Sequence, residues 1–472
     1  MNIYTLMEYL KACEKQYPER PAFIYRDFAE KKEIPFKQFL ADYYRLTHAY
    51  RKLFPPKSHI AMIAENGYRF FLHQCAIISS GNVAVVLNQT HPLGQLAEFM
   101  QLAEVSEVVC DRDYMEELPV LYEGSYRTME DVEVQMEEEV AAPEATDPDA
   151  PALILFSSGT SGKSKGVVLT NRNLITWPAY ILEQGKASHH YTLMLLPMYH
   201  IGGVCLSYEA LGRGEQLYFG SLKHLSRDLK QEQFDRIVAV PAMAERALNY
   251  ADKSEAVMEH VRGVEEIFCV GAAFPSALLE RLEALQVSPR MYYGLTETSG
   301  AVFGEGVYKK GACGRLFPFA EVMLRDGEIL VKGSNVTVGY YGDLEKTRDA
   351  FDEGWFCTGD LGEIDEEGYL FIRGRKKNTI ILSNGENVCP EELEDQLYRM
   401  PLVRECMVYG ENEEICADIF VGSSYDEDVE RQVQEYVRSI NQKLPITHRI
   451  KRTHLVHQEL PKNSMGKLIR RK

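Results

Sequence analysis

Short apolar runs alternate with segments of helical periodicity in the first 150 residues. The runs at 59–64, 83–87 and 107–110 are short and rich in apolar or β-branched side chains, which is typical of buried strands. Residues 69–79 and 94–103 carry apolar side chains at helical spacing. Strands that alternate with helices predict parallel sheets with helices packed on them.

The same alternation resumes after residue 166. Residues 191–196, 236–240, 266–270 and 290–293 predict strands, and each runs into a glycine, a proline or a polar turn. In open α/β sheets the ligand crevice lies at the carboxyl ends of the strands. The turns after these strands are therefore where we expect functional residues.

The pattern changes again in the last third of the chain. Glycine-punctuated strands are predicted at 328–332, 336–341 and 369–373, and the basic residues 374–378 are interpreted as a linker. A compact unit follows in the order strand, helix, strand, strand, helix, strand, which is ferredoxin-like. Its segments are 379–382, 390–400, 403–409, 416–421, 428–443 and 453–457.

These patterns predict an α/β fold in three parts. Residues 1–374 form a large N-terminal domain of parallel-rich sheets packed with helices, with a small glycine-rich β subdomain. Residues 375–378 form a hinge, and residues 379–472 form a small α+β C-terminal domain. We expect the N-terminal domain to bind the ligands, because it contains the turns described above.

Composition narrows the class of protein. The chain has 472 residues, a hydrophobic share of 45% and a formal net charge of −18, which disfavours nucleic acid or an anionic membrane as the main partner. None of the ten cysteines forms a C-x-x-C pair, as expected of reduced thiols. No signal peptide or 18-residue apolar stretch is present, so we expect a cytoplasmic protein without a membrane span.

The richest candidate for chemistry is the segment 157–166, Ser-Ser-Gly-Thr-Ser-Gly-Lys-Ser-Lys-Gly. Glycines expose backbone N–H groups, hydroxyls add donors and lysines add charge, which suits a nucleotide polyphosphate. A P-loop is excluded, because position 157 is serine and a second strand at 166–170, not a helix, follows the loop. The alternative is a solvated Ser/Gly turn.

Three later turns also carry suggestive groups. His200 follows a tyrosine and precedes two glycines, and residues 271–275 form a small-residue turn on which a flat ligand can lie. Residues 292–298 offer an aromatic face, a glycine, hydroxyls and the carboxylate of Glu297, a hard oxygen ligand of the kind that Mg²⁺ prefers. Taken singly, a histidine such as His200 is more often a core residue than a functional one, and Glu297 is a helix N-terminal acid that the helix dipole stabilises.

Two further positions complete the candidates. The carboxylate of Asp360 can accept from both hydroxyls of a ribose, and Arg375 can join it, although a turn aspartate and a surface arginine are the plain alternative. Near the end of the chain, proline and glycine around Lys467 indicate a loop that presents this lysine.

In this order, the motifs resemble those of the adenylate-forming enzymes, which include acyl- and aryl-CoA synthetases, adenylation domains of nonribosomal peptide synthetases, and beetle luciferases. The resemblance spans roughly residues 5–472. It implies a phosphate-binding loop with Thr160 and Lys165 at the ATP phosphates. The other members of that loop are Ser157, Ser158, Gly159, Ser161 and Gly162.

The resemblance also implies the remaining nucleotide contacts. Gly271, Ala272 and Ala273 would line the adenine edge, and Tyr293, followed by Gly294, would stack on adenine. Thr296 would contact the α-phosphate, and Glu297 would hold Mg²⁺. Asp360 and Arg375 would bind the ribose.

The resemblance also assigns three residues to individual steps of the reaction. Lys467 would bridge the substrate carboxylate and the phosphate during adenylation, and His200 would border the acyl pocket and the thiol tunnel. Gly385 would line the pantetheine channel. In such enzymes the small C-terminal domain is mobile and rotates between the two steps, exchanging the Lys467 loop for the Gly385 loop.

The implied activity is that of an AMP-forming carboxylate–CoA ligase. ATP and Mg²⁺ activate a carboxylic acid to an acyl-adenylate with release of pyrophosphate, and the thiol of CoA then takes the acyl group and releases AMP. The flank 201–205 is apolar, whereas amino-acid-activating members usually carry an acid there. A fatty or aryl acid, within fatty acid metabolism or a related pathway, is therefore expected.

Two alternatives stay open. Glu386 stands beside the channel glycine, and an acid there does not attract the phosphates of CoA, so an acyl carrier protein is a possible thiol acceptor and partner. A luciferase-like oxygenase or a non-catalytic nucleotide-binding relative is the other alternative. The presence of Lys467 and Glu297 argues against loss of catalysis, and nothing in the sequence indicates oxygen chemistry.

Overall fold

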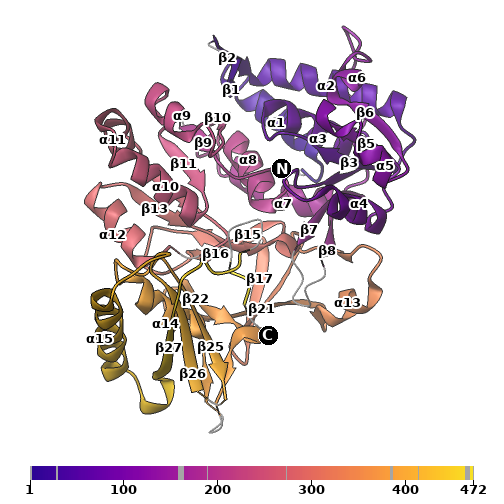
Figure 1. The fold of residues 1–472 in the computed structure, drawn as a ribbon. Helices are drawn as coiled ribbons and strands as arrows, with labels where there is room; N and C mark the ends of the chain where they lie inside the picture. The colour runs from indigo at the N-terminus through magenta and orange to yellow at the C-terminus, as the bar shows by residue number, and fades with distance from the viewer. Residues whose placement is uncertain are drawn as a thin grey trace.

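The computed structural model describes residues 3–27, 30–157, 164–188, 190–272, 274–382, 386–412, 414–462 and 468–470. Figure 1 shows two parts: a large one, coloured indigo to salmon, and a small one in orange and yellow beneath it. The large part contains two mixed sheets with their helices and a further group of antiparallel strands. This agrees with the α/β fold predicted from the sequence.

The first sheet has seven strands and is parallel except at one edge. Its order is β13 (Ser288–Met291), β12 (Glu266–Cys269), β11 (Arg236–Ala239), β9 (Tyr191–Met194), β10 (Gln216–Phe219), β1 (Pro21–Asp27) and β2 (Glu30–Pro35). Only β2 runs antiparallel to its neighbour. Three of the strands predicted between residues 191 and 293 are thus β9, β11 and β12 of one sheet, the fourth prediction overlaps β13, and the carboxyl ends of these strands lie at one edge.

The second sheet also has seven strands. Its order is β19 (Gly339–Tyr340), β8 (Lys165–Thr170), β7 (Pro151–Ser157), β4 (Val83–Val86), β3 (His59–Ile63), β5 (Glu107–Cys110) and β6 (Ser125–Thr128). The strands from β7 to β6 are parallel, whereas β8 and β19 are antiparallel to their neighbours. The three strands predicted in the first 150 residues are confirmed in this sheet.

Helices pack on both sheets. They are α1 (Leu6–Gln16), α2 (Phe36–Leu53), α3 (Tyr68–Ser79), α4 (Leu93–Leu102), α5 (Leu118–Leu121), α6 (Met129–Glu133), α7 (Asn171–Glu183), α8 (Ile201–Gly212), α9 (Leu225–Gln231), α10 (Pro241–Ala251), α11 (Glu255–Arg262) and α12 (Ser276–Ala284). Helices α3 and α8 are buried along nearly their whole lengths, because most of their side chains are apolar; their few polar residues, such as His73 and Glu209, are buried too. Their side chains join those of both sheets in the largest core cluster.

The antiparallel strands below the two sheets form the β subdomain. One group is β14 (Tyr293–Leu295), β15 (Gly300–Glu305) and β16 (Arg315–Leu316). The other is β17 (Ala320–Arg325), β18 (Glu328–Gly333), β21 (Trp355–Ile364), β20 (Phe351–Asp352) and β22 (Leu370–Arg375), with α13 (Leu344–Asp349) before β20.

Two strand predictions in this region were wrong. Residues 290–293 do not form one strand, because the chain leaves the first sheet after Met291 and enters β14 at Tyr293. Of residues 336–341 only Gly339 and Tyr340 are in a strand, and they pair with β8 rather than with the β subdomain. The hydroxyl of Thr337 donates to the carbonyl of Val168 at 2.6 Å and accepts from the N–H of Gly339 at 3.1 Å, which replaces a regular ladder there.

The C-terminal part differs from the ferredoxin-like prediction in one respect. Its elements are β23 (Ile380–Ile381), β24 (Asn387–Val388), α14 (Pro390–Tyr398), β25 (Glu405–Glu411), β26 (Glu414–Phe420), α15 (Glu427–Lys443) and β27 (Ile450–Val456). The predicted first strand pairs with β24 in a separate two-stranded sheet, so the main sheet has three strands, β25–β26–β27. Within the predicted linker, Gly374 and Arg375 are the last residues of β22 and residues 376–378 form a single 3₁₀ turn.

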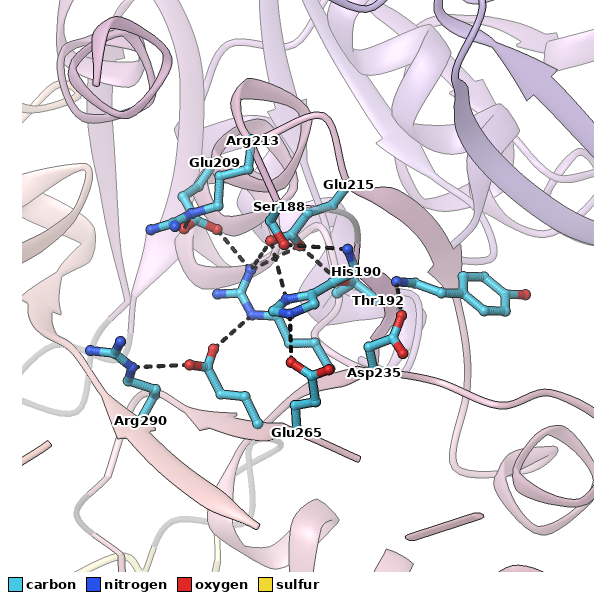
Figure 2. A network of polar contacts seen from close by, with 12 residues as sticks. Ser188, His190, Thr192, Glu209, Arg213, Glu215, Asp235, Glu265 and Arg290 are labelled. Atoms are coloured by element: carbon cyan, nitrogen blue, oxygen red, sulfur yellow. Dashed lines mark hydrogen bonds and ion pairs between the residues drawn. The ribbon is translucent and has the colours of Figure 1, made fainter. Parts of the chain in front are cut away.

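A buried polar network joins the amino ends of the first sheet's strands (Figure 2). Arg236, the first residue of β11, lies 3.1 Å from Glu209 and 3.0 Å from Glu215, and all three side chains are at most 3% exposed. Glu266, the first residue of β12, lies between Arg236 and Arg290. Because the network is at the opposite edge from the carboxyl ends, we interpret it as part of the scaffold.

Two sequence expectations concern cysteines and membranes. All ten cysteines are free thiols, and eight of them are buried, in agreement with the prediction of reduced cysteines. Among the described residues, no helix combines the length and apolar character that crossing a membrane requires.

Candidate active site

The predicted phosphate loop connects two antiparallel strands. Ser157 ends β7 and Lys165 begins β8, and these two residues pair with each other across the ladder. This confirms a strand–loop–strand arrangement in place of the strand–loop–helix of a P-loop. The candidates between them lie outside the described residues: Ser158, Gly159, Thr160, Ser161 and Gly162.

Lys165 and Glu297 meet at the hydroxyl of Tyr340. Nζ of Lys165 lies 3.3 Å from the Tyr340 hydroxyl, which donates to Oε1 of Glu297 at 3.0 Å. The ammonium also lies 4.4 Å from the centroid of the tyrosine ring. The lysine predicted at the ATP phosphates and the carboxylate predicted to hold Mg²⁺ are therefore neighbours, as a magnesium nucleotide requires.

Glu297 is held by its backbone as well as by its side chain. It lies with Thr296 in a 3₁₀ turn, and its carbonyl accepts from the N–H of Thr337 at 2.7 Å. Gly294 in β14 allows the close approach of β15 before this turn, because a Cβ there would lie 1.8 Å from the carbonyl oxygen of Gly300. Thr296 and Glu297 are only partly buried, and a carboxylate in this position fits the hard-oxygen preference of Mg²⁺.

Asp360 uses both carboxylate oxygens within the site. Oδ2 accepts from the hydroxyl of Tyr293 at 2.9 Å, and Oδ1 lies 2.7 Å from Nε of Arg375. Asp360 is 5% exposed and Tyr293 is 7% exposed. Burial, and next the Asp360 carboxylate, raise the pKa of Tyr293, so the tyrosine stays a hydrogen-bond donor. Strands β14, β21 and β22 thus bring the three predicted adenosine contacts together.

Cations gather next to this group. Burial lowers the pKa of Lys377, and the positive charges of Arg375 and Lys165 lower it further. Mutual repulsion of this kind is relieved by a bound anion. The charges of Arg375 and Lys165 thus act on Lys377, although Arg375 is itself paired with Asp360.

The other predicted contacts lie at the carboxyl ends of the first sheet. His200 precedes α8 after β9, and its ring centroid lies 4.7 Å from that of Tyr199 in an edge-on contact. Gly271 and Ala272 follow β12 and are exposed, so their backbone is accessible to a flat ligand. Ala273 lies outside the described residues. These candidates thus follow strands of the first sheet, whereas Lys165 belongs to the second.

The C-terminal candidates are located through their flanks, since Lys467 and Gly385 lie outside the described residues. Lys462 and Leu468 pair in an antiparallel bridge, and the N–H of Ile469 donates to the carbonyl of Pro461 at 2.8 Å. The described residues on either side of Lys467 are thus paired with each other. Gly385 falls between β23 and β24, which pair with each other.

Tyr340 belongs to this site although reasoning from the sequence missed it. The segment 336–341 was predicted to be a strand of the β subdomain, which would have placed it away from the phosphate loop. No sequence signal distinguishes Tyr340 from the neighbouring Tyr341; the pairing of β19 with β8 does so.

Comparison with known proteins assigns the family. The model of the AMP-binding enzyme family matches residues 10–341, and the model of the AMP-binding enzyme C-terminal domain matches residues 377–472. The chain belongs to the AMP-binding enzyme family. This confirms the resemblance to adenylate-forming enzymes that the motifs carry.

The chain is similar to several CoA ligases over most of their length. The chain is 30% identical to the 2-succinylbenzoate–CoA ligase of Bacillus mycoides and 28% identical to that of Listeria monocytogenes, covering 87% and 88% of each chain. Among solved structures, o-succinylbenzoate CoA synthetase (MenE) of Bacillus subtilis with its acyl-adenylate intermediate OSB-AMP has a TM-score of 0.81 at 24% identity. This match covers 98% of our chain and 96% of the other. ATP-bound MatB of Rhodopseudomonas palustris has a TM-score of 0.81 at 25% identity, covering 97% and 96%.

Proposed function

We propose that the protein is an AMP-forming ligase that activates an aromatic carboxylic acid of the 2-succinylbenzoate type with ATP and Mg²⁺ and transfers it to CoA. The observation that carries the adenylation step is the contact of Lys165 and Glu297 through the hydroxyl of Tyr340. Because the chain belongs to the AMP-binding enzyme family, we interpret Lys165 and Glu297 as residues that bind the phosphates and the metal ion of MgATP.

In the adenylation step, different residues bind the phosphates, the metal ion and the substrate carboxylate. Lys165, with Thr160 and the rest of the phosphate loop, binds the ATP phosphates, and Glu297 holds Mg²⁺, which shields the charge that builds during attack on the α-phosphate. Thr296 donates to the α-phosphate, and Lys467 holds the attacking carboxylate. Each contact is placed where negative charge develops, so it lowers the barrier to transfer.

The nucleoside is held by the second group. Asp360 and Arg375 bind the ribose, and Tyr293, besides donating to Asp360, supports the adenine. Gly271, Ala272 and Ala273 supply the backbone along the adenine edge. His200 borders the acyl pocket, because the turn after β9 lies at the same sheet edge as the turn after β12.

The choice of acid and acceptor follows the named relatives. Their names specify 2-succinylbenzoate and CoA, which favours an aromatic acid over a fatty acid and CoA over an acyl carrier protein. The carrier-protein alternative has no counterpart among these names. The apolar residues 201–205 in the first turn of α8 also favour an acid without an ammonium group.

The transfer step requires movement in this proposal. Residues 375–378 act as the hinge, and residues 379–472 rotate as a unit to exchange the Lys467 loop for the Gly385 loop. Polar contacts help to hold the present orientation. The hydroxyl of Ser276 donates to Asp395 at 3.3 Å, and Arg373 lies 3.5 Å from Glu392. Such contacts break at low cost.

The test is ATP-dependent release of pyrophosphate over a panel of acids, each with and without CoA. The panel holds 2-succinylbenzoate, benzoate, malonate, a medium-chain fatty acid and an amino acid. Turnover that requires both 2-succinylbenzoate and CoA is the expected result. A stoichiometric burst that CoA does not convert to turnover argues for a carrier-protein acceptor, and no release with any acid contradicts the proposed activity.

A further inference from the structure

Tyr340 contacts both charged groups on which the proposed adenylation depends. Its hydroxyl donates to Oε1 of Glu297 at 3.0 Å and accepts from Nζ of Lys165 at 3.3 Å. The lysine ammonium lies 4.4 Å from the ring centroid, within the range of a cation–π interaction. One neutral side chain thus links a carboxylate suited to Mg²⁺ with a lysine suited to phosphate.

The backbone fixes this side chain firmly. Tyr340 is 7% exposed, pairs with Val167 across the β19–β8 ladder, and donates its N–H to the hydroxyl of Thr347 at 3.0 Å. Gly339 allows this close approach, because it has φ of 135° and a Cβ there would lie 2.5 Å from Cγ2 of Thr347. Since β8 also carries Lys165, the lysine and the tyrosine ring are held by the same pair of strands.

A phenol is suited to orient a metal ligand. It donates one hydrogen bond to the carboxylate without cancelling the negative charge, whereas a lysine or arginine would compete with the metal. The ring face attracts the ammonium of Lys165 but leaves its N–H groups able to turn to phosphate.

We propose that Tyr340 is a positioning residue of this site, which orients Glu297 for Mg²⁺ and Lys165 for the phosphates of ATP. The inference rests on the proposed function, since it presumes that MgATP is bound here. No bond is made or broken at Tyr340. Its contribution is to reduce the reorganisation that the two charged groups undergo when the magnesium nucleotide binds.

The test compares Tyr340→Phe with Tyr341→Phe. Tyr341 is the next residue, and its hydroxyl donates to Glu104 at 2.9 Å, so the control loses the same kind of hydrogen bond elsewhere. Equilibrium binding of AMP, and of ATP with Mg²⁺ or with EDTA, is measured by calorimetry for both variants and the wild type. The Mg²⁺ concentration that gives half-maximal pyrophosphate release is measured alongside.

We expect Tyr340→Phe to weaken ATP binding about tenfold when Mg²⁺ is present. Binding of AMP, which needs no Mg²⁺, stays within about twofold of the wild type, and the half-maximal Mg²⁺ concentration rises. Tyr341→Phe matches the wild type in every measurement. In a Glu297→Gln background, Tyr340→Phe has no further effect on the Mg²⁺ dependence, since the contact is already altered.

Several results overturn the inference. One is a Tyr340→Phe enzyme with wild-type Mg²⁺ dependence; another is equal weakening of AMP and MgATP, which would indicate a purely structural role. Both leave the proposed function in place if the wild type activates its acid. A wild-type protein that binds no ATP and releases no pyrophosphate contradicts the proposed function itself, and with it the role of Tyr340.

Discussion

Tyr293 donates a hydrogen bond of 2.9 Å to Oδ2 of Asp360, a residue that lies far along the chain and belongs to a different sheet. Arg375 takes the other carboxylate oxygen at 2.7 Å. The three residues that the motifs assign to the nucleoside therefore form one connected group. We expect substitutions at Asp360 and at Tyr293 to lower AMP affinity by different amounts.

Replacing Asp360 with asparagine is expected to lower AMP affinity at least about tenfold. The change removes the charge that orients Arg375 and weakens the acceptor for the ribose hydroxyls, and hydrogen bonds to charged groups contribute roughly 1.5–3 kcal/mol. Tyr293→Phe removes one neutral donor and should cost about 1 kcal/mol, close to fivefold. Calorimetric titration with AMP measures both.

The control for Tyr293→Phe is Tyr180→Phe. The hydroxyl of Tyr180 also donates to a carboxylate, Glu305, at 2.8 Å, but neither residue is assigned to the nucleotide. Its AMP affinity should equal that of the wild type. Equal losses in the two tyrosine variants would show that the effect is general and that Asp360 does not hold the nucleoside.

The network around Arg236 (Figure 2) should matter for stability and not for the reaction. Arg236→Met leaves Glu215 buried without a guanidinium and Glu209 with Arg213 alone, and removing one partner of a buried pair costs about 3–5 kcal/mol. The exposed pair Arg262–Glu255 is the control, since Arg262→Met should cost less than about 1 kcal/mol. Denaturant unfolding gives both values, and similar small losses would contradict the prediction.

The same network predicts a pH dependence. Burial raises the pKa of Glu209, but the charges of Arg213 and Arg236 outweigh it and set the pKa below the usual 4.5. The folded protein therefore holds this carboxylate ionised, so its stabilising effect is present above pH 4.5 and is lost as the pH falls below that value. Glu209→Gln should flatten the acid limb of the stability profile, whereas the exposed Glu255→Gln should leave its slope unchanged.

Local sequence patterns predicted the elements well because each is short and strongly patterned. The strands at β3, β4 and β5 and the helices α3 and α15 follow from runs and periods within a dozen or so residues. The strand predictions that failed depend on pairing between segments that are far apart in the sequence. Residues 336–341 were assigned to the wrong sheet, and residues 379–382 were given a place in a sheet they do not join.

In the candidate site, too, some residues could be predicted from local sequence and others could not. Motif residues such as Glu297 and Asp360 could be found from the sequence, since their neighbours define them. Tyr340 could not, because its role arises from a two-residue ladder between β19 and β8. The buried partners of Arg236 were missed for the same reason: charged residues at strand ends look solvated until the sheet order is known.

The two C-terminal loops should separate the two half-reactions. Lys467→Ala is expected to slow adenylation at least about 100-fold, since it removes a positioned cation from developing charge. Thioester formation from a supplied acyl-adenylate and CoA should change little. Gly385→Leu should do the reverse, since the family resemblance assigns this glycine to the pantetheine channel and a leucine side chain would obstruct it. Single-turnover assays of each half-reaction measure this.

Lys462→Ala is the matched control for the lysine. It lies in the same tail but is engaged by Glu405 and Glu459, so it should retain both half-reactions. If Lys467→Ala adenylates at the wild-type rate, the assigned role of Lys467 is wrong. If Gly385→Leu slows adenylation as much as transfer, the loop at 385 does not serve transfer alone.

Arg470 follows Lys467 by three residues and is expected to act on adenylation through the position of that lysine. Its guanidinium binds both oxygens of Glu394, at 2.8 and 2.6 Å, and donates to the carbonyl of Val408 at 3.1 Å. Because a lysine cannot reproduce this two-point contact, Arg470→Lys should slow adenylation about tenfold through misplacement of Lys467, while thiolysis of supplied acyl-adenylate stays within about twofold. Arg452→Lys, at an exposed pair with Glu414 in the same domain, should affect neither step. Equal slowing of both half-reactions by Arg470→Lys would mean that the arginine supports the whole domain and not the position of the lysine.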